Sequence, residues 1–412
     1  MKAGSYTDFS ASLHRQAMAR RIPLSGAIEL THRCNLACAH CYNNLALSDA
    51  SAHAAELTLA EYQRIFGELA EAGTLWLLFT GGEVFARPDF LDIYDSAHRA
   101  GFLITLFTNA TLLTPAKADR LADRPPFAIE VSILGRTRET YEGFARAAGS
   151  FERSVEGIGL LRERGLPLTL KTVATGQNVD EVHALRRFAE EELGVPFRFD
   201  AHVSPRLDHT MPSCAVLTPE QRVALDLSDP RRPAEWRRFS GRFAAQPKQE
   251  TLYQCGGGID SFAIDPYGKL RLCVMSQEDA VDLRQTPFAD AWKGAMLEVR
   301  GRKVTRATKC LECQLKAMCG QCPAEAELAS SDPEQPVEEL CEVAHLRASA
   351  FGIDVPSHGP CDYCPGGTKH AGLLAARERL LAGSAQMPEA QATASAEGRS
   401  CAHACEACGG RP

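Results

Sequence analysis

Apolar and polar positions alternate along this chain with two different periods, one typical of strands and one typical of helices. Apolar runs of strand-forming residues occur near 27–31, 74–79, 102–107, 128–134, 167–173 and 197–203. Amphipathic stretches with helical spacing lie between them, near 58–72, 88–100, 114–123, 150–164 and 180–192. Strands joined by helical crossovers predict an α/β domain built on a parallel sheet. Periodicity does not decide whether that sheet closes into a barrel.

Local signals support this pattern and indicate where it ends. Thr58 stands at capping-box distance before Glu61, and Thr218 precedes Pro219 and Gln221 in the same way. The alternation of strand-like and helix-like stretches ends after about residue 225, where a segment rich in Pro and Arg begins. We therefore divide the chain into an N-terminal arm (1–25), an α/β core (26–225), a connector (226–254), a Cys-rich domain (255–350) and a flexible Cys-containing tail (351–412).

Charge and hydropathy narrow the range of partners. The chain has 412 residues with 52 acidic and 45 basic side chains, so its formal net charge is −7. That balance gives no basic excess for binding nucleic acid phosphates. Nothing at the N-terminus resembles a signal peptide, and no run reaches the roughly 18 apolar residues of a membrane helix. We expect a cytoplasmic protein that binds neither nucleic acid nor a membrane.

The chain has sixteen cysteines, and they are grouped along the sequence rather than scattered. In a reducing compartment disulfides seldom persist, and grouped thiolates more often bind metal. The groups are Cys34, Cys38 and Cys41; Cys214; Cys255 and Cys273; Cys310, Cys313, Cys319 and Cys322; Cys341; Cys361 and Cys364; and Cys401, Cys405 and Cys408.

The first group follows the first predicted strand directly, on a loop that contains Cys34, Cys38 and Cys41. Three thiolates can bind three irons of a cubane and leave the fourth iron open for a ligand. A structural zinc site is the alternative, but such sites require four ligands. His40 lies inside the motif, and we expect its ring to pack over the site rather than to bind metal.

Polar residues follow the next predicted strands, where the carboxyl ends of parallel strands gather functional groups. The second strand ends in Gly81, Gly82 and Glu83, and glycines allow close backbone approach to a ligand. Asn109, Ser132 and Lys171 occupy the ends of later strands, although a lysine there is equally explained as a structural charge.

The CxxxCxxC spacing at Cys34, Cys38 and Cys41 resembles the radical S-adenosylmethionine (SAM) superfamily, and the resemblance extends from residue 25 to about 350. It implies a partial (β/α)6 TIM-like barrel with a catalytic [4Fe-4S] cluster on those cysteines. The cluster would cleave SAM to a 5′-deoxyadenosyl radical that abstracts a substrate hydrogen. By the same resemblance, Gly81, Gly82 and Glu83 form the segment that receives the SAM ammonium, and Asn109, Ser132 and Lys171 contact SAM.

A second set of cysteines flanks and follows a predicted hairpin at 265–268. The set resembles the Cys-rich α+β SPASM extension of radical SAM enzymes, which binds two auxiliary [4Fe-4S] clusters. The resemblance assigns one cluster to Cys310, Cys313, Cys319 and Cys341, and the other to Cys255, Cys273 and Cys322. The second cluster would then have a position for a substrate thiolate or another protein ligand. Zinc is the alternative for the four-cysteine run.

The remaining cysteines fit neither set. We expect Cys214 to be an ordinary thiol. Cys361 and Cys364 would either bind zinc and so fix the tail, or provide a ligand to one of the clusters. The tail at 401–410 repeats the CxxxCxxC spacing, and its ending resembles the Ala-Cys-Gly repeats of small peptides paired with one subgroup of these enzymes. It is expected to be a substrate-like or cluster-handling tail, or plainly disordered.

The sequence thus resembles peptide-modifying radical SAM/SPASM maturases. The resemblance implies an oxidoreductase that modifies a small Cys-containing ribosomal peptide and takes electrons from flavodoxin or ferredoxin. The auxiliary clusters would transfer electrons or bind a substrate thiolate. Two alternatives remain open, a radical SAM reaction of small-molecule or cofactor biosynthesis and a noncatalytic metal scaffold.

Overall fold

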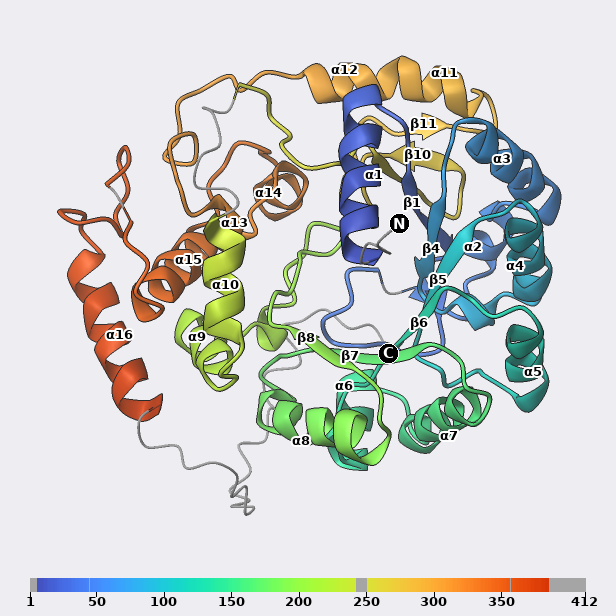
Figure 1. Ribbon diagram of the computed structural model, residues 1–412, viewed down its shortest axis with the longest axis horizontal. Helices are drawn as coiled ribbons and strands as arrows, with labels where there is room; N and C mark the ends of the chain where they lie inside the picture. Colours follow the sequence, from blue (N-terminus) through green and yellow to red (C-terminus); the bar gives the residue numbers. More distant parts are fainter. Residues whose placement is uncertain (1–5, 44, 242–249, 356, 385–412) are drawn as a thin grey trace, which may run out of the picture. The chain divides into compact units, whose positions relative to one another are not determined.

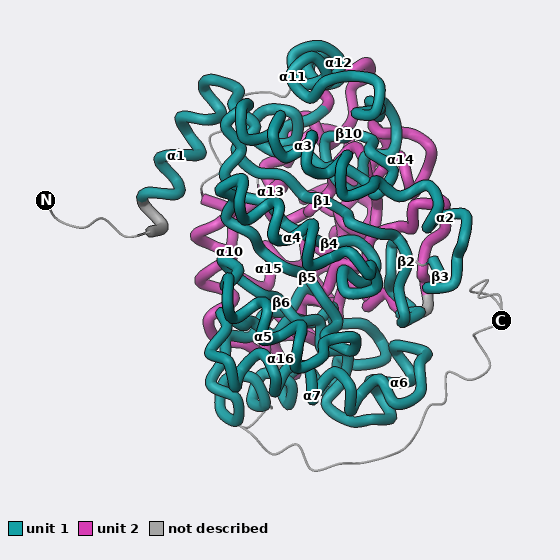
Figure 2. Tube along the Cα trace, turned by 90° about the vertical axis from the view of Figure 1, so that its right-hand side faces the viewer, with its two compact units in different colours: residues 1–200, 253–302 teal, residues 201–252, 303–412 magenta. Residues whose placement is uncertain are grey.

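The computed structural model describes residues 6–43, 45–241, 250–355 and 357–384 (Figure 1). The chain divides into two compact units (Figure 2). Unit 1 comprises residues 1–200 and 253–302, and unit 2 comprises residues 201–252 and 303–412. Each unit is described separately below.

Unit 1 is built on a sheet whose main part is parallel. Its neighbouring strands follow the chain order and are β1 (Ser25–Thr31), β4 (Trp76–Gly81), β5 (Leu103–Thr108), β6 (Ala128–Ser132), β7 (Leu168–Val173) and β8 (Phe197–Asp200). These are the six strands that the apolar runs predict. The α/β class with a parallel sheet is therefore confirmed. The sheet continues beyond β1 instead of closing there.

Helices cover one face of this sheet (Figure 1). They are α2 (Ala50–Ala55), α3 (Leu59–Glu71), α4 (Phe90–Arg99), α5 (Pro115–Asp123), α6 (Arg138–Ala145), α7 (Ser150–Glu163) and α8 (Val182–Arg187). Helix α1 (Tyr6–Arg20) precedes β1. Short helical turns are η1 (Val84–Ala86), η2 (Val179–Glu181) and η3 (Phe188–Glu192). The predicted capping box begins α3, because Thr58 and Glu61 bond each other's backbone. Buried and half-exposed residues alternate along β4 to β7, so the second face of the sheet is left more open.

The predicted hairpin extends the same sheet. Strand β9 (Ser261–Ile264) pairs in parallel with β1, and β10 (Lys269–Arg271) and β11 (Val281–Asp282) follow in antiparallel order. The turn between β9 and β10 is fixed by Asp265, whose carboxylate accepts bonds from the backbone of Tyr267 and Lys269 at 2.9 Å. Helices α11 (Phe288–Lys293) and α12 (Ala295–Gly301) complete the unit. The segment predicted as one Cys-rich domain, 255–350, is consequently divided between the two units.

Unit 2 is helical over its described residues apart from an isolated bridge between Thr251 and Lys303. Its elements are η4 (Ser213–Ala215), α9 (Pro219–Leu227), α10 (Arg232–Gly241), α13 (Lys316–Cys319), α14 (Pro323–Ser330), α15 (Glu338–Ala350) and α16 (His370–Ser384). Helix α15 is central and contacts α9, α13 and α16. Its Arg347 bonds Asp226 at 2.8 Å and lies 4.1 Å from the ring centre of Trp236. Part of the predicted connector is therefore the helix α10, and part of the predicted tail is α16.

No helix in the described segments has the length and apolar character needed to span a membrane. The tail cysteines Cys401, Cys405 and Cys408 and the predicted linker beyond Ser384 lie outside the described residues.

A buried ion cluster joins the end of β1 to the elements around it. Arg33, Glu56 and Arg87 are all at most 7% exposed. The Arg33 guanidinium bonds both oxygens of Glu56, at 2.9 and 3.0 Å. Arg87 bonds the carbonyl of Leu30 at 3.1 Å and lies 3.5 Å from the same carboxylate. Glu56 thus compensates Arg33, and together with Asp89, which bonds Arg87 at 2.8 Å, it compensates Arg87 just before the first cysteine loop.

We predict that Glu56→Gln is strongly destabilising, because it leaves the buried Arg33 guanidinium without its counter-charge and Arg87 with Asp89 alone. Breaking a buried ion pair from one side costs about 3–5 kcal/mol, and the apparent Tm should fall by roughly 6–12 °C. Glu192→Gln is the matched control, since Glu192 forms an exposed pair with Arg136 and should change Tm by under about 2 °C. Equal effects in thermal unfolding would show that burial of the cluster contributes nothing.

Candidate functional site

The first cysteine loop is fixed at both of its ends. It leaves β1 through the short strand β2 (Arg33–Cys34), which pairs with β3 (Leu45–Ala46). In the middle, the backbone of Ala37 and Ala39 donates to carbonyls at the end of α6, at 2.9 and 3.2 Å. Leu36 and Ala39 are buried, at 4% and 1% exposure. Strand pairing, backbone hydrogen bonds and two buried side chains therefore hold this loop in one conformation.

The three thiols of this loop lie close enough to influence one another. Burial, and then the Glu83 carboxylate and Cys41, raise the pKa of Cys34 to about 12. Burial also raises the pKa of Cys38 well above its usual value, followed by repulsion from Cys41 and Cys34. Adjacent buried thiols repel each other as thiolates unless a metal neutralises them. The donor set fits a cluster bound by three cysteine sulfurs.

The Gly81–Glu83 segment lies directly against the residues that precede Cys34. Gly81 has φ +118°, and a Cβ there would be 2.2 Å from the carbonyl oxygen of Thr31. A Cβ on Gly82 would be 2.3 Å from the carbonyl oxygen of Arg33. The backbone N–H of Gly82 donates to Thr31 at 2.7 Å, and that of Glu83 donates to Arg33 at 3.1 Å. Glycine is required here because backbone meets backbone.

Glu83 is fully buried, and its carboxylate joins the ends of β4 and β5. It accepts bonds from the Thr108 hydroxyl at 2.6 Å, from the Asn109 backbone at 2.7 Å and from the Phe85 backbone at 3.2 Å. Burial nevertheless raises the pKa of Glu83. The side chain therefore has a structural task at this edge, and its contact with the SAM ammonium stays a prediction.

Asn109 connects the cysteine loop to this carboxylate. Its side-chain Nδ2 lies 3.7 Å from the Cys34 sulfur and 3.2 Å from the Asn35 side chain. Its Oδ1 accepts from the Thr111 backbone at 2.9 Å. A donor aimed at a metal-binding sulfur tunes the charge on that sulfur. The structure thus gathers Cys34, Glu83 and Asn109, which are far apart in sequence, at one edge of the sheet.

Ser132 and Lys171 are neighbours in the register of β6 and β7, on the more open face of the sheet. The Lys171 ammonium lies 3.4 Å from Glu130 and over the Phe107 ring. Burial lowers the pKa of Lys171 to about 7, while Glu130 opposes that shift. Lys171 therefore has a protein partner, and its role toward SAM stays a prediction, as does that of Ser132.

Two polar residues near the cysteine loop were not anticipated. Glu29 on β1 is 2% exposed, and the hydroxyl of Tyr42, directly after Cys41, donates to it at 2.5 Å. Burial, and then Glu29, raise the pKa of Tyr42 well above its usual value. A carboxylate in the middle of an apolar strand was the signal that could have revealed this pair.

Unit 2 brings four of the predicted auxiliary ligands together. The Cys319 thiol bonds the Cys341 sulfur, and that bond lowers the pKa of Cys341, with Lys309 acting in the same direction. Burial, and then Cys310 and Cys341, raise the pKa of Cys313 to about 12. These four sulfurs form one group, and their binding of a cluster stays a prediction.

The three cysteines predicted to bind the second auxiliary cluster are distributed over both units. Cys255 and Cys273 lie on either side of the β9–β10 hairpin in unit 1, and the Cys255 sulfur bonds the Arg300 side chain. Cys322 lies in unit 2, where it caps α14 by accepting a bond from the Glu325 backbone at 3.4 Å. The assignment of these three cysteines to one cluster stays a prediction.

Comparison with known proteins agrees with this geometry. Residues 28–189 match the family model of the radical SAM superfamily. The chain is 28% identical to the AdoMet-dependent heme synthase of Methanosarcina barkeri over 344 residues, covering 74% of this chain and 93% of that protein. It is 36% identical to the PqqA peptide cyclase of Ruegeria pomeroyi over 169 residues, which is 41% of this chain and 44% of the cyclase.

Solved structures are similar in fold at low sequence identity. SuiB of Streptococcus suis bound to S-adenosylmethionine aligns with a TM-score of 0.60 at 19% identity, covering 83% of this chain and 84% of SuiB. The anSMEcpe protein with bound AdoMet aligns with a TM-score of 0.57 at 14% identity, covering 89% of this chain and 96% of its own. At these identities the likeness establishes the fold.

We predict that Gly82→Ala weakens SAM binding at least about tenfold, since its Cβ would be 2.3 Å from the Arg33 carbonyl oxygen, which cannot move without displacing Cys34. Gly159→Ala is the control, because nothing lies within 4 Å of its Cβ and alanine favours the helix α7. Equilibrium dialysis with SAM measures both variants. Wild-type affinity in Gly82→Ala would show that this backbone contact does not shape the site.

Proposed function

We propose that this chain, whose residues 28–189 form a radical SAM domain, is an enzyme that cleaves SAM reductively and modifies a ribosomally synthesised peptide. The observation that carries the proposal is the meeting of the cysteine loop, the Gly81–Glu83 segment and Asn109 at the carboxyl edge of one parallel sheet. Similarity to the PqqA peptide cyclase extends over 169 residues of this chain, and SuiB has been solved with its precursor peptide SuiA. Both relatives support a peptide substrate.

In this proposal Cys34, Cys38 and Cys41 hold a [4Fe-4S] cluster, which supplies the electron that splits SAM. The protein's own contribution is positioning. Asn109 directs an N–H toward the Cys34 sulfur, and Glu83 fixes the backbone of Asn109. The absence of side chains at Gly81 and Gly82 lets this segment pack directly on the backbone of Thr31 and Arg33, which sets Glu83 beside the cysteine loop.

The four-cysteine group of unit 2 is proposed to hold an auxiliary cluster, and Cys255, Cys273 and Cys322 a second one. They would pass electrons or bind a substrate thiolate. Clusters bound by thiolates require reduced cysteines, and a cytoplasmic location is therefore part of the proposal. A flavodoxin or ferredoxin is the proposed electron donor, and a small Cys-containing peptide is the proposed substrate.

A second candidate function is favoured by one observation. The similarity to AdoMet-dependent heme synthase extends over 93% of that protein's length, whereas the similarity to PqqA peptide cyclase covers 44% of the cyclase. A radical SAM reaction on a tetrapyrrole or another small molecule is therefore the alternative to be tested beside the peptide.

The central experiment measures 5′-deoxyadenosine after anaerobic reconstitution and reduction, with a gene-neighbouring Cys-containing peptide or a tetrapyrrole precursor as substrate. We expect stimulation by the peptide and a peptide mass reduced by about two hydrogens or otherwise changed. The variant Cys34→Ala/Cys38→Ala/Cys41→Ala should form no deoxyadenosine. It should keep about eight of the roughly twelve irons expected for three cubanes.

Deoxyadenosine formation stimulated by the tetrapyrrole alone would favour the second candidate. Failure to form deoxyadenosine with any reductant, despite intact clusters, would leave a noncatalytic metal scaffold and overturn both proposals.

A pH series tests whether Lys171 meets the SAM carboxylate. With its pKa lowered to about 7, the amine is charged below that pH and largely neutral above it, so SAM affinity should fall as the pH rises. We expect a loss of about tenfold between pH 6 and pH 8.5. The groups that face Lys171 are Glu130 on β6 and Arg198 on β8.

Lys171→Arg is the matched control for this series, because arginine keeps its charge and should flatten the pH profile. Lys171→Met should bind SAM weakly at both ends of the range. A flat wild-type profile together with unimpaired binding by Lys171→Met would assign Lys171 to a structural pair with Glu130 alone.

A further inference from the structure

A group of four potential metal ligands lies in unit 2, apart from the predicted cluster ligands. His345, His358, Cys361 and Cys364 are all buried, with exposures of 3–6%. One ligand atom from each lies within 4.8 Å of all the others. The Cys361 and Cys364 sulfurs are 3.4 and 3.6 Å from Nε2 of His345, and the Cys364 sulfur is 3.4 Å from Nδ1 of His358.

His345 is held in the orientation that a ligand requires. Its Nδ1 lies 2.8 Å from the carbonyl oxygen of Cys341, one turn earlier on α15, and must therefore be the protonated nitrogen. Nε2 consequently carries the lone pair, and it points at both sulfurs. Metal-binding histidines commonly use a backbone carbonyl in this way.

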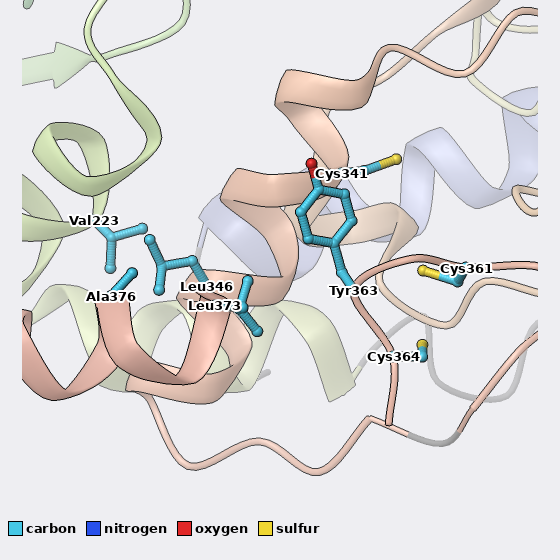
Figure 3. Packing of buried hydrophobic residues seen from close by; sticks show 8 residues of the cluster. All are labelled: Val223, Cys341, Leu346, Cys361, Tyr363, Cys364, Leu373 and Ala376. Atoms are coloured by element: carbon cyan, nitrogen blue, oxygen red, sulfur yellow. The ribbon is translucent and has the colours of Figure 1, made fainter. Parts of the chain in front are cut away.

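The segment between the two cysteines forms a tight turn. The backbone of Cys364 donates to Cys361 at 3.4 Å, and Gly367 donates to Cys364 at 2.8 Å. A Cβ on Gly367 would be 2.3 Å from the carbonyl oxygen of Asp362, so the turn requires glycine there. Figure 3 shows both cysteines on one side of Tyr363, with the apolar cluster of Val223, Leu346, Leu373 and Ala376 on the other.

We propose that His345, His358, Cys361 and Cys364 bind one Zn²⁺ ion. Two thiolates and two imidazoles are a structural zinc set, and tetrahedral bonds of about 2.0–2.3 Å separate sulfur from nitrogen by about 3.6 Å. The observed separations of 3.4–3.6 Å match that geometry. A two-iron cluster with the same residue types binds cysteines and histidines on different irons. Here both sulfurs contact the same histidine, which favours a single ion.

The ion would give a reason for burying two thiols and two imidazoles side by side. It would join α15 to the segment before α16. The inference stands independently of the proposed function, because no residue of the SAM site takes part in it. Its competitor is the use of Cys361 as a ligand of the neighbouring four-cysteine group, since Cys361 also raises the pKa of Cys313.

The test is metal analysis of the full chain, purified anaerobically from zinc-supplemented medium and reconstituted with iron and sulfide. We expect about one zinc per chain in addition to the cluster iron, with zinc-edge X-ray absorption fitted by two sulfurs near 2.3 Å and two nitrogens near 2.0–2.1 Å. Cys361→Ser/Cys364→Ser should lose that zinc and keep its iron. His370→Gln is the control, since His370 bonds the Tyr363 backbone and is not one of the four.

Three outcomes would overturn the proposal. They are the absence of zinc from the folded wild-type protein, the retention of zinc by the double variant, and the loss of iron from the double variant while its zinc is unaffected. The last result would assign Cys361 to the cluster group instead. The absorption spectrum of the wild-type protein decides the ligand set even if the double variant fails to fold.

Discussion

The backbone contact between Gly81–Gly82 and Thr31–Arg33 determines the geometry of the whole candidate active site. The carbonyl oxygens of Thr31 and Arg33 occupy the space that a Cβ of Gly81 or Gly82 would need. Because no side chain separates the two segments, Cys34 and Glu83, which directly follow them, are brought to the same place. Glu83 then positions the backbone of Asn109, and Asn109 turns toward the Cys34 sulfur. Each later contact depends on the first.

The two groups of thiols have different electrostatic surroundings. Cys34 is buried beside the Glu83 carboxylate, which raises its pKa further. In unit 2, Lys309 favours the thiolate of Cys341, and Lys309 and Lys316 oppose the raised pKa of Cys310. Burial nevertheless raises the pKa of Cys313 in unit 2, and the bond to Cys341 raises that of Cys319, so metal binding has to displace protons from thiols in both groups. A cluster beside lysines is easier to reduce than one beside a carboxylate, since net charge sets its potential.

The sequence was informative wherever short-range rules apply. Apolar runs predicted the six parallel strands, Thr58 and Glu61 predicted the start of α3, and the Asp265 turn predicted a hairpin. The meeting of the cysteine loop with Gly81–Glu83 follows from parallel topology, because consecutive strands end at one edge.

Contacts between distant segments were the ones that could not be predicted. The pairing of β9 with β1 involves short strands without periodicity. Helix α10 has a polar composition, and its Trp236 contacts Arg347 of α15, more than a hundred residues away. His345 and His358 flank a loop, so their spacing to Cys361 and Cys364 matches no short metal-binding pattern. Tertiary packing decides each of these cases.

The position of β1 between β4 and β9 has a consequence for synthesis of the chain. Strand β4 follows within about fifty residues, but β9 begins at Ser261, and all of unit 2's first segment is made in between. The backbone N–H and C=O groups on one edge of β1 therefore stay unpaired while the ribosome adds more than two hundred residues. An unpaired edge of a sheet is a template for association with other chains. The nascent protein is thus most exposed to aggregation after its six-stranded sheet has formed and before the hairpin emerges.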